Sequence, residues 1–274
     1  MIRVPVMRLL TYDREGARRL GAWVETSVVD LPDAVGHPVF PASMEGLVAR
    51  HGGTTLDAAR EALAHPGVIE EFFVAKPRVL APLVASVHHA DRPVVLGPDE
   101  ALDLRLTGGE LRVLPEIACL IGRPGARRQL GAVAGPIFGY TMMARWTHSA
   151  GGTSRLLAVS MGPLVVTPDD FEPSGLRLHL RTDGRALRSE RLQITRGKIL
   201  DSVARISGRR ELRPGEALGI ADFPGMEAPD GLAVRPGTVV ELEGTGLGTL
   251  RTCVGLRTPP GTRARRPRNR DRQP

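Results

Sequence analysis

The segment GELRVLPEIACLIGRPG, residues 109–125, carries the clearest fold signal in the chain. Its two apolar runs, GELRVL and IACLIG, are rich in branched residues and are bounded by Gly and Pro, which is typical of short buried strands. One acidic residue, Glu116, stands between the two runs, beside Pro115. The segment therefore predicts strands rather than helix, with one carboxylate placed among them.

The same strand pattern continues on both sides of this segment, over residues 79–256. The other strand-like runs are ALDLRL (101–106), LLAVSMGPLVVT (156–167), LRLHLRT (176–182) and RSERLQITR (188–196). Two more strands flank a glycine-rich segment, GTGLG (244–248). The one clear helix is GKILDSVARISG (197–208), whose apolar residues share one face. Many strands and few helices predict a closed or folded-over sheet.

The GTGLG segment predicts a turn and not a phosphate-binding loop, because it lies between two strands rather than between a strand and a helix. The sequence also lacks G-x-G-x-x-G, a Walker loop, H-E-x-x-H, a C-x-x-C pair and G-x-S-x-G, and it contains no internal repeat. These absences argue against the common dinucleotide-binding, P-loop, zinc-protease and serine-hydrolase classes.

The beginning of the chain has a different pattern. RVPVMRLLTY and AWVETSVVDL, both before residue 32, alternate in the manner of strands. Two helices follow: FPASMEGLVARHG with Ser43 as its expected cap, and TTLDAAREALAHPG with Thr55 as its expected cap. This part of the chain therefore predicts a small α/β domain.

We therefore expect an α+β, mainly β protein with two domains and a tail. The small α/β domain covers residues 1–78, and the Lys76-Pro77 and Ala81-Pro82 pairs mark the link to a β domain over residues 79–256. Residues 257–274 are rich in Arg and Pro and contain no apolar run that could pack, so they predict a disordered tail.

The net charge of +7 belongs to that tail. Seven of the 37 basic residues and one of the 30 acidic residues lie in residues 257–274, which leaves 30 basic and 29 acidic residues in the rest of the chain. The folded part is therefore close to neutral, and no nucleic-acid-binding fold accompanies the basic tail. We expect a solvated extension and no nucleic-acid partner.

Composition also limits the classes of protein to which this chain can belong. Aromatic residues make up 4% of the chain, which argues against stacking platforms for single-stranded nucleic acid. No apolar run reaches membrane-spanning length, and the N-terminus carries charges too early for a signal peptide. Cys119 and Cys253 show no metal-binding spacing and lie among apolar residues, which predicts reduced core cysteines. These features predict a cytoplasmic protein that contacts no membrane.

The order of the segments resembles the fumarylacetoacetate hydrolase family over most of residues 1–256. PEIACLIGRPG is similar to the family's acidic strand, which ends in A-x-x-I-G-R, and GPIFGYT is similar to its G-Y-T segment. The other three stretches that carry the likeness are MGPLVVTPDD, RISGRRELRPGEAL and RPGTVVELEGTGLGTLRTCV. RLGAWVETSVVDL and FPASMEGLV resemble the family's small leading domain.

This resemblance implies a folded-over sheet, a β-roll or mixed barrel, in a protein that forms a homodimer. It also implies an enzyme that hydrolyses or decarboxylates 1,3-dicarbonyl or 2-oxo acid substrates. Such enzymes usually hold a magnesium-type ion on carboxylates, and the ion stabilises the enolate left after C–C cleavage. A His paired with a Glu activates water as the general base.

The resemblance places the family's three carboxylate positions on Leu114, Glu116 and Arg145. A site with one carboxylate and a permanent cation has the wrong charge balance for Mg²⁺. We therefore expect no metal and no other cofactor, with Glu116 and Arg145 as catalytic residues. Magnesium or manganese at Glu116 is the alternative, and a purely structural salt bridge between Arg145 and Glu116 is a further interpretation.

The remaining candidate residues also follow from the resemblance. His89 matches the family's H-A segment and is the candidate base, although Arg92 stands where the family has the partner Glu. Arg155 is the cation nearest to the position of an enolate-stabilising Lys, and Tyr140 lies in the G-Y-T segment. Asp222 falls in the segment that replaces the family's T-G-T-P. We expect Arg155, Tyr140 and Asp222 to bind substrate.

His148 has two interpretations. It is a candidate substrate-binding residue, and it is also a candidate ligand of a rebuilt transition-metal site. The residues of such a site would be His88, His89, Asp91, Glu116 and His148. Nothing in their spacing demands a metal, and the nearby Arg145 argues against one.

Three functions remain open from the sequence. The first is a metal-independent acid/base enzyme that isomerises, decarboxylates, hydrates or cyclises a dicarbonyl or 2-oxo acid. The second is a metal-dependent C–C bond hydrolase of the acylpyruvate or fumarylacetoacetate type. The third is a non-catalytic protein that keeps the fold for binding or for pairing with an active partner. We favour the first, because two of the three carboxylate positions have lost their carboxylates.

Overall fold

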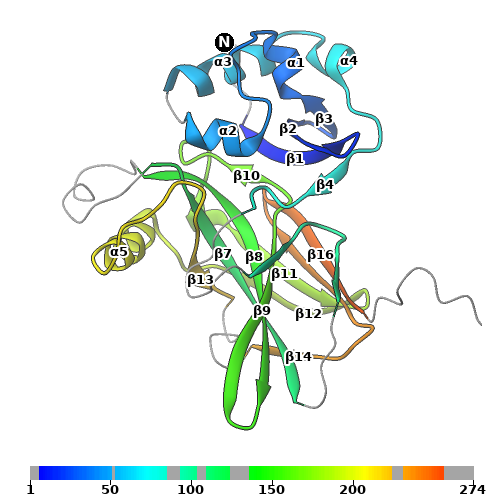
Figure 1. Cartoon of the computed structure of the whole chain (residues 1–274), viewed down its shortest axis with the longest axis vertical. Coiled ribbons are helices and arrows are strands. Elements are labelled where there is room, and N and C mark those ends of the chain that lie inside the picture. Colours follow the sequence, from blue (N-terminus) through cyan, green and yellow to red (C-terminus); the bar gives the residue numbers. More distant parts are fainter. Residues whose placement is uncertain are drawn as a thin grey trace, which may run out of the picture.

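A computed structural model describes residues 6–50, 53–84, 93–103, 109–123, 136–223 and 231–255 (Figure 1). The main sheet has eleven strands, and its central path runs β13-β7-β8-β10-β1-β2-β3, with β14, β4, β9 and β5 attached to it. A second sheet has five strands in the order β12-β11-β15-β16-β6. The mainly β, folded-over architecture is confirmed, and among the described strands no sheet closes into a barrel.

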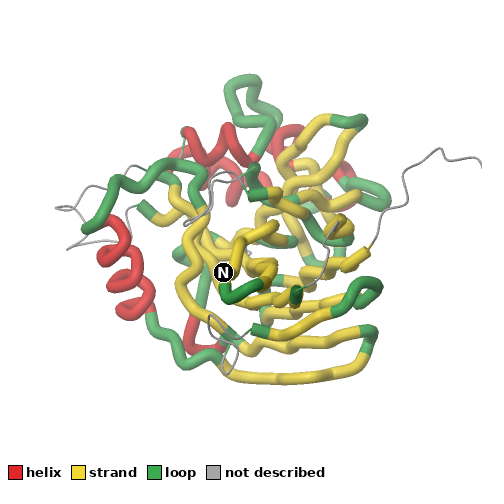
Figure 2. Tube along the Cα trace, turned by 60° about the horizontal axis from the view of Figure 1, so that its bottom comes forward, coloured by secondary structure: helices red, strands yellow, loops and turns green. Residues whose placement is uncertain are grey.

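The strands are β1 (Arg8–Arg14), β2 (Ala17–Val24), β3 (Ser27–Asp30), β4 (Arg78–Leu80), β5 (Val94–Leu96), β6 (Ala101–Asp103), β7 (Glu110–Ile121), β8 (Ile137–Ala150), β9 (Thr153–Met161), β10 (Val165–Val166), β11 (Arg177–Thr182), β12 (Arg185–Arg191), β13 (Ala217–Asp222), β14 (Leu232–Val234), β15 (Val239–Gly244) and β16 (Gly248–Gly255). The helices are α1 (Leu31–Val35), α2 (Met44–Ala49), α3 (Gly53–Leu63), α4 (Val68–Phe72), α5 (Arg196–Ser207) and a 3₁₀ turn, η1 (Pro173–Gly175). Helices α1–α4 gather at one end, whereas α5 lies apart at the side, next to β13 (Figures 1 and 2).

The segment that decides the fold is one strand, β7, and not the two that its sequence suggests. Pro115 lies inside β7, where a proline lacks the N–H that a sheet normally uses. The carbonyl of Pro115 accepts a hydrogen bond from the Phe223 backbone N–H at 2.9 Å, just where β13 ends. β14 pairs with residues 111–113 of β7 and β13 with residues 116–120, so the missing N–H of Pro115 falls in the gap between these two partner strands.

The N-terminal helices match the sequence prediction in part. Ser43 caps α2, and its hydroxyl accepts a hydrogen bond from the Gly46 N–H at 3.1 Å. Helix α3 begins at Gly53, so the prediction that Thr55 is its cap was wrong. AWVETSVVDL is not one strand either: a turn at Glu25, with a φ of 52°, folds it into the β2–β3 hairpin.

Two clusters of buried residues pack against opposite faces of β7 and β8. One fills the space toward the five-stranded sheet and α5, and its members include Tyr140, Trp146, Leu180 and Val203. The other joins the N-terminal helices to the sheet, and its members include Leu47, Ala118, Met143 and Val165. Alternation along the two strands therefore assigns most of their buried apolar side chains to one or the other cluster.

The sheet runs through both predicted domains, because β1 pairs with β10 and β10 pairs with β8. The predicted boundary at residue 78 falls at the start of β4, which itself pairs with β1. The division into 1–78 and 79–256 stays a prediction, and the predicted tail over 257–274 lies outside the described residues.

Several smaller predictions can be compared with the structure. The predicted helix at 197–208 is α5, and GTGLG forms the turn between β15 and β16. Both cysteines are free; Cys119 is buried and Cys253 is half-buried. Within the described residues, no helix is both long and apolar enough to cross a membrane.

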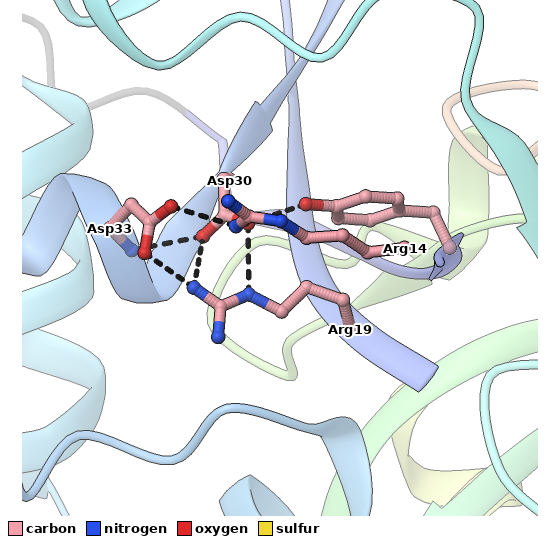
Figure 3. A network of polar contacts seen from close by, with 5 residues as sticks. Arg14, Arg19, Asp30 and Asp33 are labelled. Carbon is pink, nitrogen blue, oxygen red and sulfur yellow. Dashed lines mark hydrogen bonds and ion pairs between the residues drawn. The ribbon is translucent and has the colours of Figure 1, made fainter. Parts of the chain in front are cut away.

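Asp30 organises the N-terminal end of the molecule (Figure 3). Its buried carboxylate accepts hydrogen bonds from the Tyr12 hydroxyl, from Arg14 Nη1 at 2.7 Å and from Arg19 Nε at 2.9 Å. Asp30 also caps α1, since its Oδ1 accepts the Asp33 backbone N–H at 2.9 Å. One carboxylate thus ties strands β1, β2 and β3 to the first helix.

We predict that Asp30→Ala lowers the free energy of unfolding by about 3 kcal/mol, because it removes a helix cap and leaves the buried Tyr12 hydroxyl and the half-buried Arg19 guanidinium without their acceptor. Asp33→Ala is the matched control: its carboxylate also pairs with Arg14 and Arg19, but its side chain is 45% exposed. We expect the control to cost less than about 1 kcal/mol. Urea denaturation measures both, and equal losses would contradict the role given to Asp30.

Candidate functional site

Three neighbouring strands, β13, β7 and β8, bring polar side chains together at one end of the main sheet's central path. In the antiparallel pairing of β7 with β8, Leu114 lies opposite Arg145, so Glu116 is a diagonal neighbour of Arg145 on the same face. On the other side of β7, Asp222 of β13 pairs with Glu116. The backbone register therefore places Glu116 between Arg145 and Asp222.

The side chains meet as the register predicts. Arg145 Nε donates to Glu116 Oε1 at 2.5 Å, and Arg145 Nη2 lies 3.5 Å from Asp222 Oδ1. The side chain of Glu116 is only 3% exposed, whereas those of Arg145 and Asp222 are 24% and 33% exposed. The result is a cation held by one buried and one accessible carboxylate.

Gly219 lets the Glu116 carboxylate fit into the sheet. A Cβ atom at position 219 would lie 2.1 Å from Glu116 Oε2 and 2.7 Å from its carboxyl carbon. The β13–β7 pairing shifts register between Gly219 and Ala221, which is a bulge of the kind that re-aims side chains next to functional sites. The missing side chain of Gly219 thus supplies the space that the carboxylate occupies.

Burial raises the pKa of Glu116 to about 7. The desolvation of the carboxylate outweighs the positive charge and hydrogen bond of Arg145, which lower the pKa, and the negative charge of Asp222 adds to the rise. A carboxyl group with a pKa near neutrality can both take and return a proton at physiological pH. Glu116 therefore has the properties of a general acid/base.

The Glu116–Arg145 pair lines a cavity of about 350 Å³ between β13 and helix α5. A second hollow of about 520 Å³ adjoins it, and the two share Ser202, Arg205 and Asp222 among their lining residues. Arg205 and Arg209 supply further positive charge to the wall, and neither forms an ion pair with any described residue. The groove can thus hold a small anionic molecule beside a buried acid/base.

Tyr140 is not brought to this cavity. It lies on the opposite face of β8 from Arg145, packs in the cluster with Trp146, and stacks on Phe171 with ring centroids 4.2 Å apart. Burial raises the pKa of its hydroxyl. Tyr140 is thus placed as a core residue, and the substrate-binding role that the resemblance implies for it stays a prediction.

His148 and Arg155 lie opposite each other at the far end of the β8–β9 hairpin. His148 pairs with Leu111, five residues along β7 from Glu116, which corresponds to roughly 16 Å at strand spacing. Arg155 is exposed, and neither residue lines the cavity. The structure therefore brings together Glu116, Arg145 and Asp222 and leaves His148 and Arg155 apart from them.

The sequence suggests two alternative metal sites, one for magnesium or manganese at Glu116 and one for a transition metal, and the structure shows which ligand atoms are available for them. Within the described ranges no group of three or more His, Cys, Asp or Glu side chains could hold an ion. Leu114 offers no ligand atom, and Glu116 Oε1 is engaged by the guanidinium of Arg145. His88, His89 and Asp91, together with Arg92, lie outside the described residues.

Sequence reasoning missed Gly219 and the two arginines Arg205 and Arg209. One signal was available for the arginines: positions 198, 202, 205 and 209 recur at helical spacing, on a face of α5 that flanks its apolar face, with Arg209 two residues beyond the end of the helix. No local signal marks Gly219, because its role depends on a carboxylate about a hundred positions earlier in the chain.

A family comparison decides the identity of the fold. The profile of the fumarylacetoacetate (FAA) hydrolase C-terminal family matches residues 56–255, well over half of the chain. The chain belongs to this family. The resemblance drawn from five sequence stretches is therefore confirmed. No protein of curated function matches the sequence.

Solved structures agree with the assignment. The fumarylacetoacetate hydrolase of Exiguobacterium antarcticum matches with a TM-score of 0.65 and 18% identity, over 92% of this chain and 100% of that chain. The maleylpyruvate hydrolase of Sphingobium sp. SYK-6, in complex with manganese(II) and pyruvate, matches with a TM-score of 0.69 and 20% identity, over 91% and 100%. A probable 2-hydroxyhepta-2,4-diene-1,7-dioate isomerase of Mycobacterium abscessus matches with a TM-score of 0.67 and 19% identity, over 92% and 98%. At such identities the likeness shows the fold alone.

We predict that Gly219→Ala displaces the Glu116 carboxylate and breaks its ion pair with Arg145. Overpacking at a buried charged group should lower the free energy of unfolding by about 1–3 kcal/mol. Gly175→Ala is the matched control, because a Cβ there meets no atom within 4 Å. Urea denaturation of both variants tests the prediction, which fails if Gly219→Ala is as stable as Gly175→Ala.

We also predict a distinctive pH dependence of stability. Because the folded-state pKa of Glu116, about 7, lies above the ordinary value of 4.5, the folded protein binds this proton more tightly than the unfolded chain does. This stabilisation is complete below pH 4.5 and is lost as the pH rises to 7, a fall of roughly 3 kcal/mol.

Glu116→Gln isolates this contribution, since glutamine does not titrate. The free energy of unfolding of the wild type, minus that of Glu116→Gln, should fall between pH 4.5 and pH 7 when measured by urea denaturation. Glu61→Gln, at an exposed position of α3, is the control and should track the wild type. Parallel curves for the wild type and Glu116→Gln would refute the raised pKa.

Proposed function

We propose that this protein is a metal-independent acid/base enzyme that isomerises a 2-oxo acid or a related dicarbonyl acid by proton transfer. The observation that carries the proposal is the pairing of buried Glu116 with Arg145 on the wall of a cavity. A base and a fixed cation side by side are what proton abstraction next to a carbonyl requires.

The proton is moved by Glu116. In its ionised form the carboxylate removes a proton from the carbon next to the substrate carbonyl, and the C–H electron pair becomes the enolate. Protonated Glu116 then returns the proton to another carbon of the conjugated system. Nothing is consumed besides the substrate, and the product is its isomer.

The enolate charge is stabilised by Arg145. Its guanidinium stays charged at any physiological pH, so it can hold an anion but cannot donate the proton. Asp222, 3.5 Å from Arg145 Nη2, keeps the guanidinium turned toward the cavity while Glu116 is protonated. Asp222 is therefore a positioning residue for Arg145, or a direct partner of the substrate.

The residues present do not fit the magnesium-type ion that the family usually holds. One of the three carboxylate positions is buried Leu114 and another is Arg145, whose guanidinium already bonds the single remaining carboxylate. An added dication would meet a fixed positive charge in place of ligands. We propose that Arg145 supplies the positive charge instead.

The rest of the groove suits a substrate with a second negative group. Arg205 and Arg209 line the cavity wall without ion pairs among the described residues, and an arginine binds a carboxylate through two parallel hydrogen bonds. The printed names of two solved relatives describe isomerases of dioates, which is consistent with such a substrate. His89 stays a candidate second acid/base, and the homodimer and the cytoplasmic location stay predictions.

The test is hydrogen–deuterium exchange at C3 of 2-oxoglutarate, followed by NMR in D₂O with a chelator present. We expect the wild type to catalyse exchange faster as the pH rises through 7, because the ionised form of Glu116 is the base. Glu116→Gln should lower the rate by about 10²-fold or more, and Arg145→Lys should retain part of it.

Glu70→Gln, at an exposed position of α4, is the control and should exchange at the wild-type rate. Stoichiometric Mn²⁺ binding that restores activity after chelation would favour a metal-dependent hydrolase of C–C bonds instead. No exchange with 2-oxoglutarate, pyruvate or acetoacetate would favour the non-catalytic alternative.

A further inference from the structure

A separate cavity, of about 530 Å³, shares none of its described lining residues with the two hollows beside α5. It forms where strands β1, β2 and β4 meet the turn between β15 and β16 and the segment before β10. Its lining residues are Arg8, Leu10, Trp23, Val79, Pro163, Leu164, Gly246, Gly248 and Thr249. Its volume falls in the range of small-molecule sites.

Among the described residues that line this cavity, Arg8 is the one that carries a charge. Its Nε atom is buried and makes no hydrogen bond, and Arg8 forms no ion pair with any described residue. A buried guanidinium N–H without an acceptor is costly, and a native structure seldom keeps one without a reason. The Arg8 side chain as a whole is half-buried, so its charge lies on the wall of a cavity whose described lining residues include no carboxylate.

The other walls limit what that molecule can be. Leu10 and Leu164 belong to a buried apolar cluster against which Trp23 packs, and Val79 and Pro163 extend the apolar surface. Among the described lining residues, the Thr249 hydroxyl and the Trp23 indole N–H are the only other polar side-chain groups. A phosphate dianion would require more donors than this, whereas one guanidinium matches one carboxylate.

The glycine-rich GTGLG turn, which contributes nothing to the proposed catalytic site, shapes this cavity. Gly248 has a φ of +83°, and a Cβ there would lie 2.7 Å from Pro163 Cγ. Gly246 has a φ of +77° and faces open space. The turn therefore packs closely against Pro163 at Gly248. At Gly246, where no side chain is present, no other atom lies close, and both glycines line the cavity.

We propose that this cavity is a second binding site, for an organic monocarboxylate with a flat apolar body. The carboxylate pairs with the guanidinium of Arg8, and the body lies against Trp23 and the leucines beneath it. The proposal does not depend on the proposed catalytic function, because the lining residues that the structure describes for the two cavities do not overlap.

Tryptophan fluorescence with cinnamate as the probe tests the proposal. The chain has two tryptophans: Trp23 lines the cavity, and Trp146 is fully buried with its Nε1 bonded to Ser160 Oγ at 2.8 Å. We expect cinnamate to quench Trp23 emission saturably and to bind about tenfold or more tighter than cinnamamide, its neutral analogue. Arg8→Gln should remove that preference for the anion.

Two controls accompany the measurement. Arg185→Gln removes an exposed arginine of β12 and should leave cinnamate binding unchanged, and Trp23→Phe should abolish the quenching. The proposal is overturned if cinnamate does not quench saturably, or if it binds no better than cinnamamide. It is also overturned if Arg8→Gln binds cinnamate as tightly as the wild type does.

Discussion

The buried ion pair between Glu116 and Arg145 is the constraint on which the centre of this molecule depends. A carboxylate that is 3% exposed costs several kcal/mol to desolvate, and the guanidinium offsets that cost only if it lies within hydrogen-bond distance. The two residues come from different strands, so the β7–β8 register must be kept. A slip of one residue would turn Arg145 to the opposite face, where Tyr140 and Trp146 pack. The hydrophobic faces and the ion pair thus specify the same register.

The same pair also sets the limits of the chemistry. A divalent ion accepts several oxygen ligands and can rearrange them during a reaction, whereas a guanidinium offers planar, directional N–H donors and a single fixed charge. Arg145 can therefore stabilise an enolate, but it cannot activate a water molecule as a metal ion does. Under the proposed function, the site therefore serves reactions that need only proton transfer beside a carbonyl, which favours isomerisation over hydrolysis.

Much of the fold could be predicted from sequence, because the relevant signals are local. Ser43 caps α2 through its own hydroxyl, and the apolar spacing of α5 is complete within one segment. The errors arose where tertiary contacts override local signals. Pro115 predicted a break, but it is tolerated in β7 because it falls between two partner strands, and Thr55 lies inside a helix that begins at Gly53. The Glu116–Arg145 contact could be inferred from the family pattern. The approach of Gly219 to Glu116 could not, since it exists only when β13 pairs with β7.

The cavity beside α5 and the cavity at Arg8 share one feature, which is an excess of positive charge on their walls. Apart from the predicted tail, the chain is almost neutral, so most arginines can be matched by carboxylates, as Arg14 and Arg19 are matched by Asp30. Arg8, Arg205 and Arg209 have no such match among the described residues, and all three line cavities. An unmatched guanidinium on a cavity wall raises the local positive potential, and apolar neighbours of low dielectric strengthen its attraction for anions. The described part of this chain has nearly balanced charge, yet these three arginines on cavity walls lack a carboxylate partner. We therefore expect anionic ligands to bind beside them.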